Sequence, residues 1–138
     1  MNKVAIVFWS ATGNTETMAN CIAEGAKGTL LSCGEMTPAK LAEFDVVAFG
    51  CPAMGAEQLE ESEFEPMFAG LEGRLNGKKI ALFGSYGWGD GQWMRDWAER
   101  AQGDGAQLFS QEGLICNETP DEDVQAACRQ LGADLAAW

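Results

Sequence analysis

Short apolar runs alternate along the chain with segments in which apolar residues recur at helical spacing. The runs that predict strands are Val4–Trp9, Thr29–Cys33, Val46–Gly50, Ile80–Ser85 and Gln107–Cys116. The segments with helical spacing are Asn14–Ala26, Glu63–Leu75, Gly91–Gln102 and Asp121–Ala137. Continuous apolar strands fit a sheet that is buried on both faces. The alternation therefore predicts an α/β fold, in which helices cover both faces of a parallel sheet.

Proline and glycine mark where several of these elements begin or break. Pro120 fits the first position of the closing helix, with Thr119 as its N-cap. A short helical turn is expected after Pro38, and Gly113 indicates a bulge or bend inside the last apolar run. No repeat, linker or low-complexity segment separates the elements, so we expect one domain over residues 1–138.

The loop Ser10–Thr15 joins the first apolar run to the first helical segment. Free backbone N–H groups and the positive end of the helix dipole meet at such a position. Its hydrogen-bonding side chains are those of Ser10, Thr12, Asn14 and Thr15. Gly13 lets the backbone approach a ligand closely. We interpret the loop as a phosphate cradle that contains no Lys or Arg.

An ordinary helix cap is the alternative interpretation, since Ser and Thr commonly cap helices after a strand. The loop lacks the Gly-Lys-Ser/Thr of nucleotide hydrolases and the three spaced glycines of dinucleotide sites. Hydroxyl and amide side chains grouped around a single glycine favour the phosphate cradle.

Two further loops follow apolar runs and carry one large, polarisable side chain each. Met54 lies in Cys51–Glu57, and Trp88 lies between glycines in Tyr86–Asp90. In a parallel sheet of this kind, ligands bind outside the carboxyl ends of the strands. Either side chain taken alone is explained by packing within its own domain. With a phosphate cradle at the same edge, a planar ligand held between the two side chains is the better interpretation.

Composition narrows the functional classes. The formal net charge is −12, which argues against nucleic acid or an anionic membrane surface as a partner and predicts partners with basic surfaces. The absence of histidine excludes imidazole acid–base chemistry and histidine metal sites. The five cysteines form no CxxC pair, so a disulfide framework or a thiolate metal site is not expected. With no signal peptide and no membrane-spanning run, we expect a cytoplasmic monomer.

Taken together, these residues resemble the flavodoxins, specifically the short-chain subgroup of clostridia and related anaerobes. Ser10–Thr15 resembles the phosphate loop of that family, Ala53–Glu57 its first flavin loop and Phe83–Gly89 its second. Glu60–Pro66 is also similar to the short-chain subgroup, and the last apolar run lacks the long insertion of the other subgroup. The resemblance covers the whole chain.

The resemblance implies a three-layer fold with five parallel strands in the order 2-1-3-4-5 and one non-covalently bound FMN. It implies a low-potential one-electron carrier between reductases and acceptor enzymes, with oxidised, semiquinone and hydroquinone states, and not an enzyme. The residues that would bind the cofactor are Ser10, Ala11, Thr12, Gly13, Asn14, Thr15, Pro52, Ala53, Met54, Gly55, Ala56, Glu57, Ser85, Tyr86, Gly87, Trp88, Gly89 and Asn117.

Within that set, the resemblance implies particular roles. Met54 and Trp88 would cover the two flavin faces, and the Glu57 carboxylate would accept a hydrogen bond from flavin N3–H. The Gly55 carbonyl would lie near N5, and the Gly89 amide near the pyrimidine O2. Two positions depart from the family: Pro52 stands where some members have Ser, and Ala56 where others have Asp.

No basic residue occurs between Lys40 and Arg74. The acidic residues of that span are Glu43, Asp45, Glu57, Glu60, Glu61, Glu63, Glu65 and Glu72. A negative field beside the flavin would disfavour its doubly reduced, anionic form and so lower the potential. The alternative is a solvated acidic face that only maintains solubility.

Two other functional classes fit parts of the pattern. An FMN-dependent quinone or flavin reductase would need a second pocket, and little chain is left to build one. A phospho-accepting receiver domain would need acidic residues after the first and third apolar runs, where this chain has Trp9-Ser10 and Gly50-Cys51.

Replacing Thr12 by Val tests the phosphate cradle, because it keeps the shape and deletes one hydroxyl. A hydrogen bond to a charged group contributes roughly 1.5–3 kcal/mol. The affinity for FMN should therefore fall about tenfold or more, whereas the affinity for riboflavin, which has no phosphate, should hardly change. Fluorescence titrations measure both, and equal losses for the two ligands would contradict the assignment.

Overall fold

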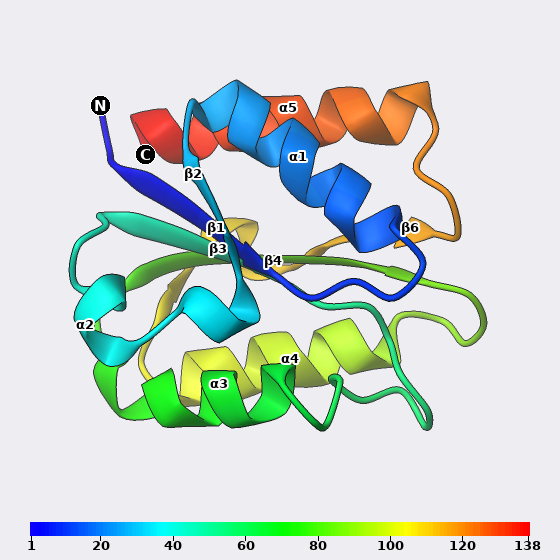
Figure 1. Cartoon of the computed structure of the whole chain (residues 1–138), viewed down its shortest axis with the longest axis horizontal. Helices are drawn as coiled ribbons and strands as arrows, with labels where there is room; N and C mark the ends of the chain where they lie inside the picture. The colour runs from blue at the N-terminus through cyan, green and yellow to red at the C-terminus, as the bar shows by residue number, and fades with distance from the viewer.

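The computed structural model describes all 138 residues and shows a parallel sheet between two layers of helices (Figure 1). The strands are β1 (Val4–Phe8), β2 (Thr29–Ser32), β3 (Val46–Gly50), β4 (Lys79–Tyr86), β5 (Gln107–Leu108) and β6 (Leu114–Asn117). The helices are α1 (Asn14–Ala26), α2 (Pro38–Leu41), α3 (Phe64–Leu71), α4 (Gln92–Gly103) and α5 (Glu122–Ala137). The strand order is β2-β1-β3-β4-β5, and β6 also pairs with β4. The predicted fold class and strand order are confirmed.

Alternate residues of the central strands enter two separate hydrophobic cores. In β1, Ala5 and Val7 belong to the core under α3 and α4, whereas Val4 and Ile6 belong to the core under α1 and α5. β3 and β4 alternate in the same way, with Val47, Phe49, Ile80 and Leu82 in the first core and Val46, Ala48, Ala81 and Phe83 in the second. Figure 1 shows the two helix pairs on opposite faces. Burial on both faces explains why these strands have no polar alternation.

The last predicted strand is in fact two strands. β5 and β6 both pair with β4, but a 3₁₀ turn at Phe109–Gln111 separates them. Ser110 (φ 55°) and Gln111 (φ 63°) are left-handed, so the chain turns before Gly113 and not at it. Gly113 serves close packing instead, because a Cβ there would lie 2.1 Å from the sulfur of Met94 in α4.

Two helix boundaries also differ from the predictions. The N-cap of α5 is Asp121 and not Thr119: the Asp121 carboxylate accepts from Val124 N–H at 2.9 Å. Pro120 precedes this cap, and its carbonyl accepts from the Gln125 side chain. The segment Glu63–Leu75 divides into α3 and a 3₁₀ turn at Glu72–Arg74. The short turn after Pro38 is present as α2, capped by Thr37.

A buried carboxylate stabilises the start of α3. Glu60 is 6% exposed and accepts from the backbone N–H groups of Ser62 (2.8 Å), Glu63 (2.8 Å) and Phe64 (2.9 Å). The Ser62 hydroxyl donates to it as well. Burial by itself would raise the pKa of Glu60, but these hydrogen bonds outweigh burial and lower it to about 2.

Replacing Glu60 by Gln should lower the free energy of unfolding by about 1–2 kcal/mol at neutral pH, as loss of a helix cap does. Because the folded state lowers this pKa from 4.5 to about 2, the carboxylate stabilises the fold above pH 4.5 and loses that effect as the pH falls towards 2. Urea unfolding at several pH values should show a shallower acid dependence for the variant. Glu61→Gln, which changes an exposed neighbour, is the control and should match the unmodified chain.

Candidate cofactor site

Nine of the eighteen predicted site residues line one hollow at the carboxyl edge of the sheet, and the other nine, among them Ser10, Glu57 and Trp88, lie outside its lining. A cavity of about 390 Å³ lies between the loops that follow β1, β3, β4 and β6. Its lining is Ala11, Thr12, Asn14, Pro52, Ala53, Met54, Ser85, Tyr86, Gly87, Glu118 and Thr119. Glu118 and Thr119 were missed by the sequence analysis, although they directly follow Asn117 in a loop at this edge. No Lys or Arg lines the cavity.

The first loop presents its polar groups at the N-terminus of α1. The residue before the helix is Gly13, which is left-handed (φ 96°) and provides no side-chain cap. Ser10 Oγ accepts from Gly13 N–H at 3.1 Å and from Glu16 N–H at 3.3 Å. Thr12 Oγ1 accepts from Asn14 N–H at 3.4 Å. The hydroxyls of Ser10 and Thr12 thus accept from amides at the start of this 13-residue helix, as the helix-cap interpretation expected. The same end carries the positive pole of the helix dipole, which suits an anion without a cation.

Thr15 and Ser85 are joined to each other. Their hydroxyls lie 3.0 Å apart, and Thr15 Oγ1 also accepts from Ser85 N–H at 3.3 Å. Both residues are buried, at 1% and 4% exposure. Thr15 does not line the cavity, so its hydroxyl ties the cradle to β4. No local pattern around either residue indicates a pair that is 70 positions apart.

The second loop is a tight hairpin. Met54 and Gln58 exchange backbone hydrogen bonds of 2.8 and 2.9 Å, and between them Gly55 (φ 51°) and Glu57 (φ 54°) are left-handed. Glycine adopts this conformation freely, whereas for glutamate it is strained. The strained Glu57 also holds a buried carboxylate oxygen, Oε1, without a hydrogen-bond partner. A buried acceptor of this kind suits an N–H donor from a ligand.

The third loop meets the second at Gly89. This glycine is left-handed (φ 88°), and a Cβ there would lie 2.4 Å from Glu57 Oε1. The neighbouring Trp88 is 69% exposed, as its flanking glycines indicated. Asn117 from the fourth loop donates its side-chain N–H to the Tyr86 carbonyl at 3.4 Å. One edge of the sheet therefore carries the exposed indole of Trp88, the unpartnered Glu57 Oε1 and the N-terminus of α1. This combination fits a ligand with a flavin ring and a phosphate tail.

The sequence profile of the family described as flavodoxin matches residues 6–131. The chain belongs to the flavodoxin family. Flavodoxins bind FMN and transfer electrons, so FMN is the cofactor of this chain and electron transfer, not catalysis on a substrate of its own, is its function.

Relatives and solved structures resemble this flavodoxin over nearly its full length. It is 46% identical to a flavodoxin of Megasphaera elsdenii, over 96% of this chain and 98% of the relative. It is 45% identical to a flavodoxin of Clostridium beijerinckii, over 95% and 97%. The solution structure of two-electron reduced Megasphaera elsdenii flavodoxin superposes with a TM-score of 0.88 at 43% identity, covering 98% of this chain and 99% of the other. Both named relatives are short-chain flavodoxins, as the sequence indicated.

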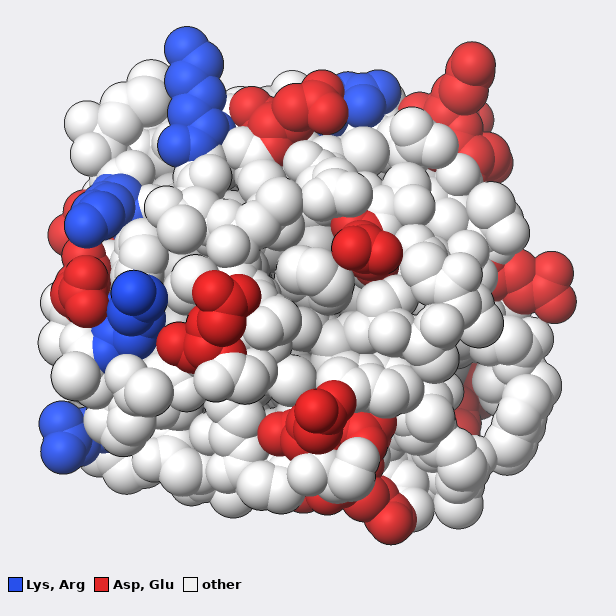
Figure 2. All heavy atoms as spheres, viewed as in Figure 1, with Lys and Arg blue, Asp and Glu red and all other residues white.

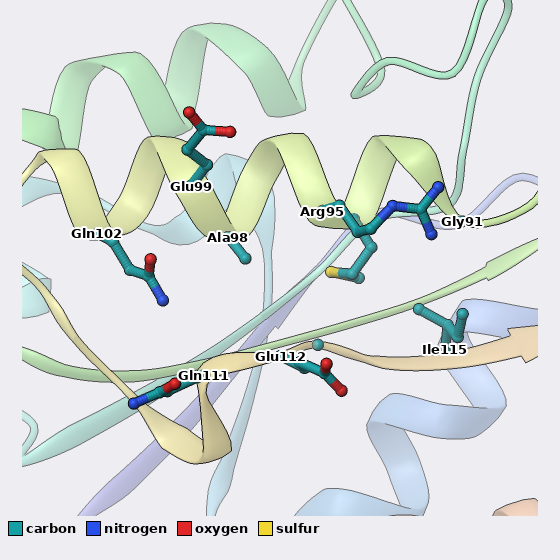
Figure 3. Close-up of a pocket in the computed structure, with 10 residues that line it drawn as sticks. Gly91, Arg95, Ala98, Glu99, Gln102, Gln111, Glu112 and Ile115 are labelled. Carbon is teal, nitrogen blue, oxygen red and sulfur yellow. The ribbon is translucent and has the colours of Figure 1, made fainter.

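A second hollow of about 440 Å³ lies between α4 and the broken edge strand (Figure 3). Its polar lining includes Arg95, Glu99, Gln102 and Glu112. The Arg95 guanidinium donates to Asp90 at 3.0 Å and to the Gln92 side chain at 2.9 Å. None of the lining residues was predicted to bind the cofactor, whereas nine of the residues that line the smaller cavity were. The smaller cavity is therefore the better candidate for the flavin.

Replacing Gly89 by Ala should displace the Glu57 carboxylate, because the new methyl group would overlap Oε1. We expect the affinities for FMN and riboflavin to fall together, by about tenfold, the cost of one hydrogen bond to a charged group. Isothermal titration of both ligands measures this. Gly77→Ala is a matched control: Gly77 is equally left-handed (φ 77°), but nothing lies within 4 Å of its Cβ position. A fall for FMN alone, or an equal fall in the control, would contradict this placement of Glu57.

Proposed function

We propose that this flavodoxin is a low-potential one-electron carrier whose FMN occupies the 390 Å³ cavity and extends between the second and third loops, where Glu57 and Trp88 lie outside the lining of the cavity. The observation that carries the proposal is the buried, unpartnered Glu57 Oε1 next to the loop of the exposed Trp88. When bound, FMN supplies the one-electron chemistry, and the protein sets its affinity and potential. We propose further that residues 1–138 act as one FMN-binding domain.

In this proposal the first loop anchors the phosphate. The backbone N–H groups at the start of α1 and the side chains of Ser10, Thr12 and Asn14 donate to its oxygens. Gly13 and Ala11 keep the loop open to the ligand. Thr15 contributes through its link to Ser85, which holds the phosphate loop against the strand that leads into the third loop.

The second and third loops hold the ring system. Met54 and Trp88 cover its two faces and exclude water, and Glu57 accepts from the ring N–H. The carbonyl of Gly55 and the amide of Gly89 face the ring edge. The remaining contacts to the ribityl chain and the ring edges come from Pro52, Ala53, Ala56, Ser85, Tyr86, Gly87 and Asn117.

The charge distribution supports a low potential. Figure 2 shows acidic side chains over most of this face, including the edge that carries these loops, while basic side chains gather mainly towards the opposite edge. Two of the acidic residues are partly neutralised, because they share the single positive charge of Arg100, which pairs with Glu65 at 2.7 Å and with Glu72 at 2.6 Å. Glu57 and its exposed neighbours have no such cation. Adding negative charge to a flavin beside them is disfavoured, which lowers the potential.

Flavodoxins act with redox partner proteins, and for this chain we propose partners with basic docking surfaces. The net charge of −12 would steer such partners, so electron-transfer rates should fall as ionic strength rises. None of the helices combines the length and apolar character that crossing a bilayer requires. All five cysteines are free and buried, which supports a reducing, cytoplasmic compartment. We propose that the protein acts there as a monomer.

Stepwise reduction with dithionite, followed in the visible spectrum, tests the proposal. We expect one FMN per chain and two well-separated one-electron steps, the second at low potential. A protein that passes directly to the two-electron reduced form, and that oxidises NADH without a partner, would instead be a quinone or flavin reductase on the same scaffold.

Replacing Trp88 by Ala should raise the midpoint potential of the second one-electron step. Loss of the indole admits water, and a higher local dielectric weakens the penalty on added negative charge. Spectroelectrochemical titration measures the shift. Trp88→Phe, which retains an aromatic cover, should change the potential less. An unchanged or lower potential in Trp88→Ala would remove Trp88 from this role.

A further inference from the structure

Helix α4 carries two buried tryptophans, and one of them reaches the base of the second loop. Trp93 and Trp97 are each 2% exposed. The indole N–H of Trp93 donates to the Cys51 carbonyl at 3.1 Å. The indole nitrogen of Trp97 is buried without a partner. The two tryptophans of this helix thus differ: Trp93 donates a hydrogen bond to a backbone carbonyl near the proposed cofactor site, and Trp97 does not.

The bond from Trp93 completes the attachment of this segment. Cys51 N–H donates to the Phe83 carbonyl at 3.1 Å, and Ala53 N–H donates to the Ser85 carbonyl at 3.0 Å. These two bonds attach the amides of Cys51 and Ala53 to β4, and the bond from Trp93 attaches the Cys51 carbonyl that lies between them. Without Trp93 that buried carbonyl would lose the donor shown here, a substantial penalty for a buried polar group.

The close approach depends on Gly84. A Cβ at this position would lie 2.2 Å from the Cys51 oxygen and 3.2 Å from Cζ2 of Trp93. Any larger residue would therefore push the carbonyl and the indole apart. The absence of a side chain lets strand, loop and helix meet at one point.

Trp93 also contacts the other ring-binding loop. Its ring lies 5.5 Å from that of Tyr86, at an angle of 49°, and Tyr86 opens the loop that carries Trp88. Trp93 and Trp97 both line a hollow that Ala56 and Glu57 also line, so the contact with Tyr86 and the bond to Cys51 are what distinguish Trp93. One side chain therefore supports both loops that we propose to enclose the flavin ring.

We propose that Trp93 is a positioning residue that sets the spacing of the two ring-binding loops through the Cys51 carbonyl. This inference rests on the proposed placement of FMN. Since the helix that follows the phosphate loop packs in the other core, loss of the bond should weaken binding of the ring and leave binding of the phosphate unchanged.

Trp93→Phe tests the role, with Trp97→Phe as the matched control in the same helix. For Trp93→Phe we expect the dissociation constants of FMN and riboflavin to rise together, by roughly threefold to tenfold, the worth of one neutral hydrogen bond. The potential of the first one-electron step should shift, and the amide NMR signal of Ala53 should move in the cofactor-free protein. Trp97→Phe should lower the unfolding midpoint to a similar extent and leave both dissociation constants within about twofold of the original.

A second variant separates the hydrogen bond from packing. The isosteric amino acid 3-benzothienylalanine at position 93 keeps the ring shape and removes the N–H donor, and it should reproduce the weaker binding and the shifted potential. Equal effects of the two phenylalanine variants, or wild-type binding by the isostere, would overturn the positioning role. If instead the unmodified chain bound riboflavin no better than free phosphate, the proposed site itself would be wrong.

Discussion

The structure depends on burying one parallel sheet on both of its faces. Each central strand sends alternate residues into different cores, so neither core is complete without helices on its own side. Helices must then cross from one strand to the next, and every crossing loop lies at an end of the sheet. The loops at the carboxyl edge are thereby gathered around one hollow, although their residues are far apart in the chain.

An acidic chain that holds a phosphate needs a source of positive potential, and here no Lys or Arg provides it at the cavity. In our proposal the start of α1 takes that role, with the amides of Gly13 and Glu16 already turned towards Ser10. A phosphate loop that relies on a helix dipole adds no full positive charge near the flavin ring. It therefore does not offset the negative field that we propose lowers the potential of the flavin.

The sequence predicted the elements well because strands buried on both faces are continuous apolar runs. The predictions were wrong where a tertiary contact determines the structure, or where two neighbouring residues could play the same local role. Thr119 and Asp121 can both cap a helix, and only the bond to Val124 distinguishes them. The break after Leu108 uses left-handed Ser110 and Gln111, which have no glycine signature.

The loops that line the cavity were identified from the sequence, because serine, threonine and glycine at strand ends carry local chemistry. The links between the loops were not found. The Thr15–Ser85 pair and the bond from Trp93 to Cys51 join positions that are 70 and 42 residues apart. Such pairs are a property of the folded chain, and no local pattern at either position indicates its partner.

The division of the interior into two cores has a consequence for how this protein can diversify. The helix that begins at the phosphate loop packs in one core through Met18 and Ile22, while the second loop and α4 are backed by the other core through Trp93. Substitutions that accumulate in one core leave the packing of the other largely intact. Substitutions in the core under α3 and α4 could thus change the surroundings of the flavin ring and its reduction potential. Binding of the phosphate would be selected separately, through the other core.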